Sequence, residues 1–349
     1  MSVPDSESQL LHRLPKAELH LHLEGCLTPA LLMQLARHHG DKLDHDEVAA
    51  RYNTHTFSEF IELFKWATSY LRAPADYAMV AKHRASELRK QNVRYAEITL
   101  SAGVMLLRKQ DVAANFRAIR DAFDSQAESQ LLRVQWIFDA VRQFGADKAM
   151  EVARVAVHLK SEGVVAFGLG GDEESAPAED FRKVYDYVAS EGLHRLAHAG
   201  EMGGPQSVRD AVEILGAQRI GHGIASIHDE QLMDLLIERH IPLEICPESN
   251  LCTGALAKLT GVSEARFENH PLPKFVLRGV PVTLATDDPA MFRATLDETY
   301  VNVRQRLNLS MPQLVRLAES GFQFAFLPTD QKQSLLREFH SEAKRLGLL

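Results

Sequence analysis

The stretch Pro15-Lys-Ala-Glu-Leu-His-Leu-His-Leu-Glu-Gly25 carries two histidines, His20 and His22, separated by one residue. If residues 17–23 form a strand, side chains two positions apart project from the same face, so the two imidazoles stand side by side. Imidazole nitrogen is a common zinc ligand, and a catalytic zinc takes three or more protein ligands while leaving a position for water. An ordinary alternating strand with a polar outer face gives the same pattern, so the pair alone leaves both interpretations open.

Seven further β-like runs follow, each rich in Val, Ile, Leu or aromatic residues, with helical patterns between them. Alternating strands and helices with apolar strands are typical of a parallel sheet covered by helices. Eight such units predict an α/β fold of the closed (β/α)8 TIM barrel type. The eight runs are residues 16–23, 93–101, 132–141, 164–170, 193–198, 219–224, 241–245 and 281–286.

The long gap between residues 25 and 93 predicts additional helices inserted after the first strand. Thr28-Pro29 is typical of an N-cap followed by proline at the first helical position. Residues 56–59, Thr-Phe-Ser-Glu, fit a capping box. We expect this insertion to pack over the barrel mouth. An apolar stripe at i, i+3, i+4 and i+7 in it is more typical of core packing than of a substrate wall, and comprises Phe57, Phe60, Ile61 and Phe64.

The end of the chain also predicts helices beyond the barrel. The pattern after Pro289 is helical to the last residue, with expected breaks at Pro312, Gly321 and Pro328. There is no internal repeat, no low-complexity tract and no linker in the sequence. Residues 1–349 are therefore expected to form a single domain.

Composition favours a small-molecule partner. The chain has 349 residues, 45% hydrophobic and 25% charged, with a formal net charge of -8. Since it lacks a run rich in Lys and Arg, neither nucleic acid nor a membrane surface is an expected partner. The first residues carry acid rather than an apolar leader, and no stretch approaches about 18 apolar residues, so a cytoplasmic location is expected. The oligomeric state does not follow from the sequence.

Three cysteines, Cys26, Cys246 and Cys252, lack Cys-x-x-Cys spacing and are odd in number. This pattern argues against a disulfide framework and against a zinc site made of cysteines. Any metal is therefore expected to be held by histidine and carboxylate.

Unusual polar residues stand at the ends of the later strands, where barrel active sites are assembled. The fifth run ends with His198, a candidate third ligand, and Glu201 follows in a glycine-containing turn. His222 lies between two glycines and is a candidate general base. Adjacent Asp287 and Asp288 would repel each other unless a cation or hydrogen-bond donors offset the charge. A helix N-cap before Pro289 is the alternative interpretation of these aspartates.

Other catalytic patterns are missing. The sequence has no Gly-x-Ser-x-Gly, no Walker loop and no His-Glu-x-x-His. The glycine-rich run at 168–173 lacks dinucleotide spacing and is expected to let the backbone approach a ligand. The remaining histidines, His270 among them, are interpreted as structural or solvated.

Taken in order, these residues resemble the adenosine deaminase family of metal-dependent hydrolases. The resemblance covers nearly the whole chain and implies a (β/α)8 barrel with one zinc that removes the exocyclic amine of a 6-aminopurine nucleoside. Its motifs are the His-x-His strand, Gly-Asp-Glu at 171–173, His-Ala-Gly-Glu at 198–201, Gly-His-Gly at 221–223, Cys-Pro-Glu-Ser-Asn at 246–250 and Thr-Asp-Asp-Pro at 286–289.

The resemblance also implies a role for each residue. The zinc ligands would be His20, His22, His198 and Asp287. Zinc lowers the pKa of a bound water to about 7, and His222 would help to deprotonate and orient that water. Glu201 would donate a proton to purine N1 and Asp288 would contact N7. The Gly171 backbone would contact N3, while His22 and Glu24 would border the substrate.

Metal number follows from the fourth strand. Binuclear relatives bridge two ions with a modified lysine at its end, but this chain has Gly-Leu-Gly-Gly-Asp-Glu at 168–173. The resemblance therefore implies one Zn²⁺ per chain.

Two departures from the family pattern concern the substrate. Many adenosine deaminases have Leu-Asp-Gly after His-x-His, with the aspartate at the nucleoside 5′-hydroxyl, whereas this chain has Leu23-Glu24-Gly25. The second strand ends Leu-Ser-Ala-Gly at 100–103, where many relatives have an Arg-Tyr-Ser-Pro type of ending. Adenosine or deoxyadenosine is the first expected substrate. The alternative is 6-aminodeoxyfutalosine, an adenosine-like intermediate of menaquinone synthesis with a larger 5′ substituent. Adenine deamination and a non-catalytic nucleoside-binding role rank below these.

Overall fold

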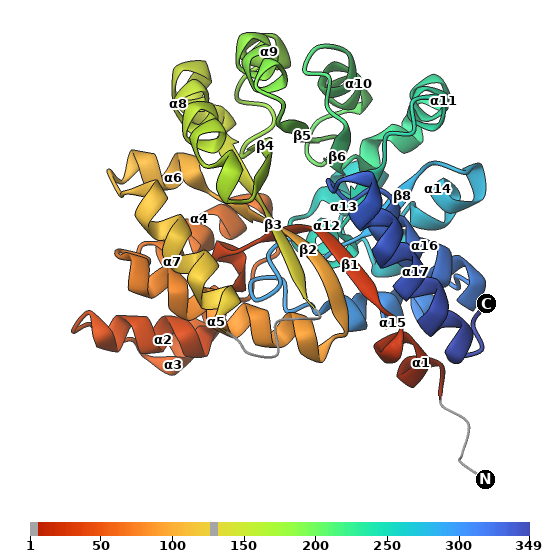
Figure 1. Cartoon of the computed structure of the whole chain (residues 1–349), viewed down its shortest axis with the longest axis horizontal. Coiled ribbons are helices and arrows are strands. Elements are labelled where there is room, and N and C mark those ends of the chain that lie inside the picture. The colour runs from red at the N-terminus through yellow and green to blue at the C-terminus, as the bar shows by residue number, and fades with distance from the viewer. Residues whose placement is uncertain (1–5, 126–131) are drawn as a thin grey trace.

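Each strand is a short apolar run, and in the computed structural model, which describes residues 6–125 and 132–349, each pairs in parallel with the next along the chain. Figure 1 shows these strands in the middle of the molecule with helices around them. The arrangement confirms the predicted (β/α)8 barrel. The strands are β1 (Lys16–His22), β2 (Val93–Leu100), β3 (Arg133–Val141), β4 (Val164–Gly170), β5 (His194–Ala199), β6 (Arg219–His222), β7 (Leu243–Ile245) and β8 (Val282–Leu284).

Helices follow the strands as the alternating pattern predicts. They are α6 (Ala102–Leu107) and α7 (Val112–Asp124) after β2, α8 (Gly145–His158) after β3, α9 (Arg182–Ser190) after β4, α10 (Pro205–Glu213) after β5, α11 (Glu230–Glu238) after β6, and α12 (Pro247–Cys252), α13 (Ala255–Thr260) and α14 (Leu272–Arg278) after β7. A short helix, α1 (Glu7–Arg13), precedes β1. Among residues 6–125 and 132–349, no helix combines the length and apolar character needed to cross a bilayer. Residues 1–5, on which the expected absence of a leader partly rests, lie outside the described residues.

The insertion after β1 contains four helices, α2 (Pro29–His38), α3 (His45–Arg51), α4 (Phe57–Thr68) and α5 (Pro74–Lys90). Its predicted N-caps are present, because Thr28 Oγ1 accepts the N–H of Leu31 at 3.2 Å and Thr56 Oγ1 accepts that of Glu59 at 3.3 Å. Glu59 does not complete the capping box, since its carboxylate accepts the N–H of His55 instead.

Three helices end the chain, α15 (Leu296–Arg306), α16 (Met311–Gln323) and α17 (Thr329–Arg345). Pro312 stands in the first turn of α16 and Pro328 directly precedes α17, as expected. The break expected at Gly321 is wrong, because this residue lies inside α16. A Cβ there would lie 2.9 Å from the carbonyl oxygen of Ala17, so glycine allows α16 to pack against β1.

The barrel closes through Asp287, three residues after β8. Its N–H donates to the carbonyl of His20 at 3.1 Å, and its carbonyl accepts the N–H of His22 at 2.9 Å. No helix begins at Pro289. The carbonyl of Asp288 instead accepts the N–H groups of Met291 and Phe292 in a turn. The helix N-cap interpretation of the two aspartates is therefore wrong.

Candidate metal and catalytic site

The four predicted metal ligands meet at the carboxyl end of the barrel. His20 and His22 lie on β1, His198 on β5 and Asp287 just after β8, and one ligand atom from each lies within 4.8 Å of the others. The Nε2 atoms of His22 and His198 are 3.3 Å apart. Asp287 Oδ1 lies 3.3 Å from Nε2 of His20 and 3.4 Å from Nε2 of His22. Three segments far apart in the sequence thus direct their ligand atoms at one point.

The hydrogen bonds of His20 fit a bound divalent cation. Nε2 of His20 is buried and has no hydrogen-bond partner among the described residues. Its Nδ1 lies 2.7 Å from Oε2 of Glu244, a buried carboxylate on β7. Since this carboxylate favours a proton on Nδ1, the lone pair on Nε2 is left for a metal. Glu244 is itself paired with Nε of Arg219 at 2.6 Å. Three imidazoles and one carboxylate form a donor set suited to zinc.

Two non-glycine residues of the site have a left-handed backbone. Asp287 has φ of 65° and His222 has φ of 61°, a region that non-glycine residues occupy at a cost of about 1–2 kcal/mol. Asp287 is held there by its two backbone bonds to β1 and by the hydroxyl of Ser249, which donates to Oδ2 at 2.7 Å. Strain that the surroundings hold in place is common at functional sites.

Glu201 and His222 face each other beside the four candidate metal ligands. Oε2 of Glu201 lies 3.6 Å from Nε2 of His222, and the hydroxyl of Thr253 donates to its Oε1 at 3.1 Å. Burial, then the negative charges of Asp287 and Glu173, raise the pKa of Glu201 to about 8. Burial lowers the pKa of His222 to about 4. Near neutral pH the pair therefore consists of a protonated carboxyl and a neutral imidazole.

Glu173 holds the turn that carries Glu201. Its Oε2 accepts the backbone N–H groups of Glu201 at 3.1 Å, Met202 at 2.9 Å and Gly203 at 2.7 Å. Its Oε1 accepts the N–H of Gly200 and the hydroxyl of Ser207. One carboxylate from the segment after β4 thus binds five donors of the segment after β5. This arrangement fixes the path of the chain beside the carboxyl of Glu201.

Asp288 lies directly against the segment after β1. A Cβ at Gly25 would lie 2.0 Å from Oδ1 of Asp288, so only glycine at position 25 allows the two segments to come this close. Burial, together with the charge of Asp287, raises the pKa of Asp288 well above its usual range. Asp288 is therefore a candidate hydrogen-bond donor.

A cavity of about 300 Å³ opens above these residues. Strand-end residues form its polar wall, and α4, with Val104 and Phe144, forms an apolar wall. Phe57, Phe60, Ile61 and Phe64 therefore border the cavity as well as packing on the core, so their interpretation as core alone is incomplete. The polar wall comprises His22, Ser101, Asp139, Gly170, Gly171, His198, Glu201, His222, Asp287 and Asp288.

Glu24 lies behind this wall in the short 3-10 helix Glu24–Cys26 and is not among the residues that line the cavity. Its Oε1 accepts the N–H of Ser101 at 3.0 Å, while its Oε2 is buried without a partner among the described residues. Burial raises the pKa of Glu24 to about 7.

Several residues of the site had no predicted role. Glu244 supports His20, Glu173 supports the Glu201 turn, and Asp139, at the end of β3, lines the cavity. Burial raises the pKa of Asp139 to about 8. Its position at a strand end could have identified it from the sequence. Asn250 and His270 are buried and hydrogen-bonded to each other behind His222, and His270 is one of the histidines expected to be structural or solvated.

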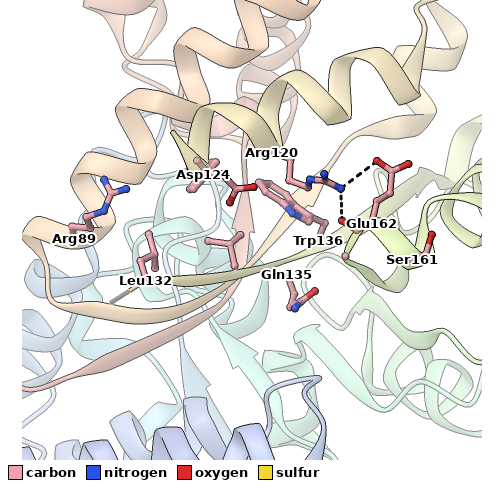
Figure 2. A pocket seen from close by; sticks show the side chains of 11 residues that line it. Arg89, Arg120, Asp124, Leu132, Gln135, Trp136, Ser161 and Glu162 are labelled. Atoms are coloured by element: carbon pink, nitrogen blue, oxygen red, sulfur yellow. Dashed lines mark hydrogen bonds and ion pairs between the residues drawn. The ribbon is translucent and has the colours of Figure 1, made fainter. Parts of the chain in front are cut away.

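A second hollow of similar size lies at the opposite, amino-terminal end of β3 (Figure 2). Its lining includes Arg89, Arg120 and Trp136, and Arg120 is already paired with Glu162 at 3.2 Å. None of the four candidate metal ligands lines this hollow.

The chain is similar to known deaminases in sequence and in fold. The model of the adenosine deaminase family matches residues 15–342. An aminodeoxyfutalosine deaminase of Streptomyces coelicolor is 38% identical over 96% of this chain and 86% of its own length. An adenine deaminase of Chlorobium phaeobacteroides is 31% identical over 97% and 99%. The solved structure of an adenine deaminase from Arthrobacter aurescens superimposes with a TM-score of 0.86, at 28% identity, covering 95% of this chain and 99% of that one.

Proposed function

Since the chain belongs to the adenosine deaminase family and is a deaminase of adenine-like substrates, we propose that it uses one Zn²⁺ to hydrolyse the 6-amino group of a 6-aminopurine. The observation that carries this proposal is the convergence of His20, His22, His198 and Asp287 beside Glu201 in one cavity. When bound, zinc would supply a water molecule acidic enough to attack at neutral pH.

The surrounding side chains support each proton transfer and contact that the reaction needs. Protonated Glu201 would donate to N1, which makes C6 electrophilic. Asp288, with its raised pKa, would donate to N7, which is an acceptor. The backbone of Gly171, whose φ is 91°, would approach N3. In the balanced reaction the oxygen of water replaces the amino group, one proton ends on N1 and one leaves with ammonia.

We propose aminodeoxyfutalosine as the preferred substrate. The support is the 38% identity to the Streptomyces coelicolor enzyme and the apolar wall of α4, which offers surface to a group larger than the purine itself. Adenine is the second candidate, favoured by relatives at 31% and 32% identity that are named for it. Adenosine, the first expectation from the sequence, stays a prediction.

The test is a side-by-side measurement of kcat/KM for aminodeoxyfutalosine, adenosine and adenine with the zinc-loaded enzyme. We expect aminodeoxyfutalosine to give the highest value. A higher value for adenine would replace the preferred substrate but keep the reaction, whereas no turnover of any 6-aminopurine would refute the proposed function.

A further inference from the structure

A chain of buried hydrogen bonds leads from a backbone amide to His222. The N–H of Leu272, the first residue of α14, lies 3.1 Å from Nδ1 of His270. Nε2 of His270 lies 3.2 Å from Oδ1 of Asn250, and Nδ2 of Asn250 lies 3.1 Å from Nδ1 of His222. His270, Asn250 and His222 are 3%, 0% and 1% exposed, so no solvent competes for these bonds.

The direction of every bond in this chain follows from its first member. A backbone N–H can only donate, so Nδ1 of His270 is an acceptor and the proton of that ring is on Nε2. A protonated His270 would point N–H at N–H, which geometry forbids, and burial also lowers its pKa to about 3. The Nε2–H of His270 must meet an acceptor, which identifies the oxygen of Asn250. The amide nitrogen of Asn250 then donates to His222.

We infer that His270 and Asn250 are positioning residues that hold neutral His222 with its proton on Nε2, so that His222 acts on the reaction as a hydrogen-bond donor. Its part in deamination rests on the proposed function, whereas the position of the proton does not.

The Nε2–H of His222 points into the gap between two carboxylates. Oε2 of Glu201 lies at 3.6 Å and Oδ2 of Asp287 at 3.8 Å, both beyond a direct hydrogen bond. An attacking oxygen in this gap would accept a hydrogen bond from the Nε2–H of His222 and keep a lone pair directed at C6. Neutral His222 has no lone pair on Nε2, so it does not accept the proton of water. As the oxygen bonds to C6 and the C6–N bond breaks, Glu201 would give its proton to N1. Of the two protons that the water releases, one would restore Glu201 and the other would leave with the ammonia.

Nitrogen-15 NMR of the zinc-loaded, full-length enzyme tests the proton position directly. With labelled histidine, and His222 assigned by its loss in His222→Gln, we expect an unprotonated Nδ1 and a protonated Nε2. Asn250→Asp, which can only accept from both rings, should move the proton of His222 to Nδ1. A proton on Nδ1 in the unaltered enzyme overturns the inference, whichever compound proves to be the substrate.

Two replacements of His270 distinguish control of the His222 proton, through the hydrogen bonds of His270 and Asn250, from simple structural support. We call this series of hydrogen bonds the relay. Asn places an oxygen near the position of Nδ1 and keeps the acceptor for Leu272, but it loses the donor to Asn250. Gln places an amide nitrogen near the position of Nε2 and keeps that donor. We expect His270→Asn to lower kcat by about 10- to 100-fold with little change in KM, and His270→Gln to retain most of the activity. Equal loss in both variants, or the opposite order, would overturn the relay.

Discussion

The backbone carbonyl of Asp287 accepts the N–H of His22 at 2.9 Å, so two of the four candidate metal ligands also join the last and first strands of the barrel. The N–H of Asp287 returns a bond to the carbonyl of His20 at 3.1 Å. Because backbone pairing fixes these positions, the spacing of the ligand atoms depends on barrel closure rather than on flexible side chains. A site held this way is arranged before the metal arrives.

Asp287→Asn should remove the metal while preserving the barrel. Asparagine tolerates the left-handed backbone and keeps the two backbone hydrogen bonds to β1. It lacks the charge that holds a cation. We expect zinc content after dialysis to fall well below one per chain, with a loss of at least about 100-fold in kcat/KM. Exposed Asp186→Asn is the matched control. Full zinc content in the variant, or two zinc ions per unaltered chain at full activity, would contradict the assignment.

Glu201→Gln should abolish proton donation without disturbing the fold. The amide is similar in size and still accepts from Thr253, but it cannot supply a proton to N1. We expect kcat to fall by about 10²- to 10⁴-fold, with zinc content and Tm unchanged. Glu191→Gln, on the surface, controls for the loss of a charge. Near-normal turnover of the Glu201 variant would refute the role.

The rate should depend on pH through the same carboxyl. Because burial raises the pKa of Glu201 to about 8, the donating form is present below that pH and is lost as the pH rises through it. We expect kcat/KM to fall about tenfold per pH unit above about 8. A profile of kcat/KM from pH 6 to 10 at constant ionic strength measures this. Activity that rises steadily up to pH 10 would exclude a protonated Glu201 as the donor.

Glu173→Gln should loosen the turn around Glu201. The amide group would direct N–H at some of the five groups that now donate hydrogen bonds to the carboxylate. A hydrogen bond to a charged group is worth about 1.5–3 kcal/mol. We expect kcat/KM to fall by about 10- to 100-fold and hydrogen exchange at residues 200–203 to accelerate. The neighbouring Glu174 is exposed and paired with Lys258, so Glu174→Gln is the control. Unchanged exchange in the Glu173 variant would contradict the clamp.

Phe64→Ala should affect large substrates more than small ones. Removing a ring from the apolar wall of the cavity costs about 1.5–3 kcal/mol of burial for a group that packs on it. We expect KM for aminodeoxyfutalosine to rise about tenfold, and KM for adenine to change by less than about twofold. Ser58→Ala, on the exposed side of α4, is the control. An equal effect on both substrates would place the larger substituent elsewhere.

Much of the barrel could be predicted because its signals are local. Strand periodicity placed His20 and His22 on one face, and strand ends marked His198 and Asp287. The same reasoning failed at Gly321, where a glycine expected to end a helix instead serves a close contact with Ala17. Only tertiary packing distinguishes these two uses of glycine.

The supporting residues could not be predicted for a different reason. Glu244 lies 224 positions from the histidine that it orients, and Glu173 is 28 positions from Glu201. No periodicity links such partners, since they meet only when the barrel forms. His270 shows the same limit, because a buried relay residue and a solvated histidine look alike in a sequence.

The position of α4 in the chain has an evolutionary consequence. The groups proposed to act on the purine ring come from strand ends, where backbone pairing resists change, whereas the apolar wall comes from a helix inserted between β1 and β2. The proposed function therefore predicts that substitutions in residues 57–64 alter which compound is chosen without disturbing how its amine is removed. Enzymes that diverged from this architecture are expected to differ first in that helix and last where Asp287 joins β1.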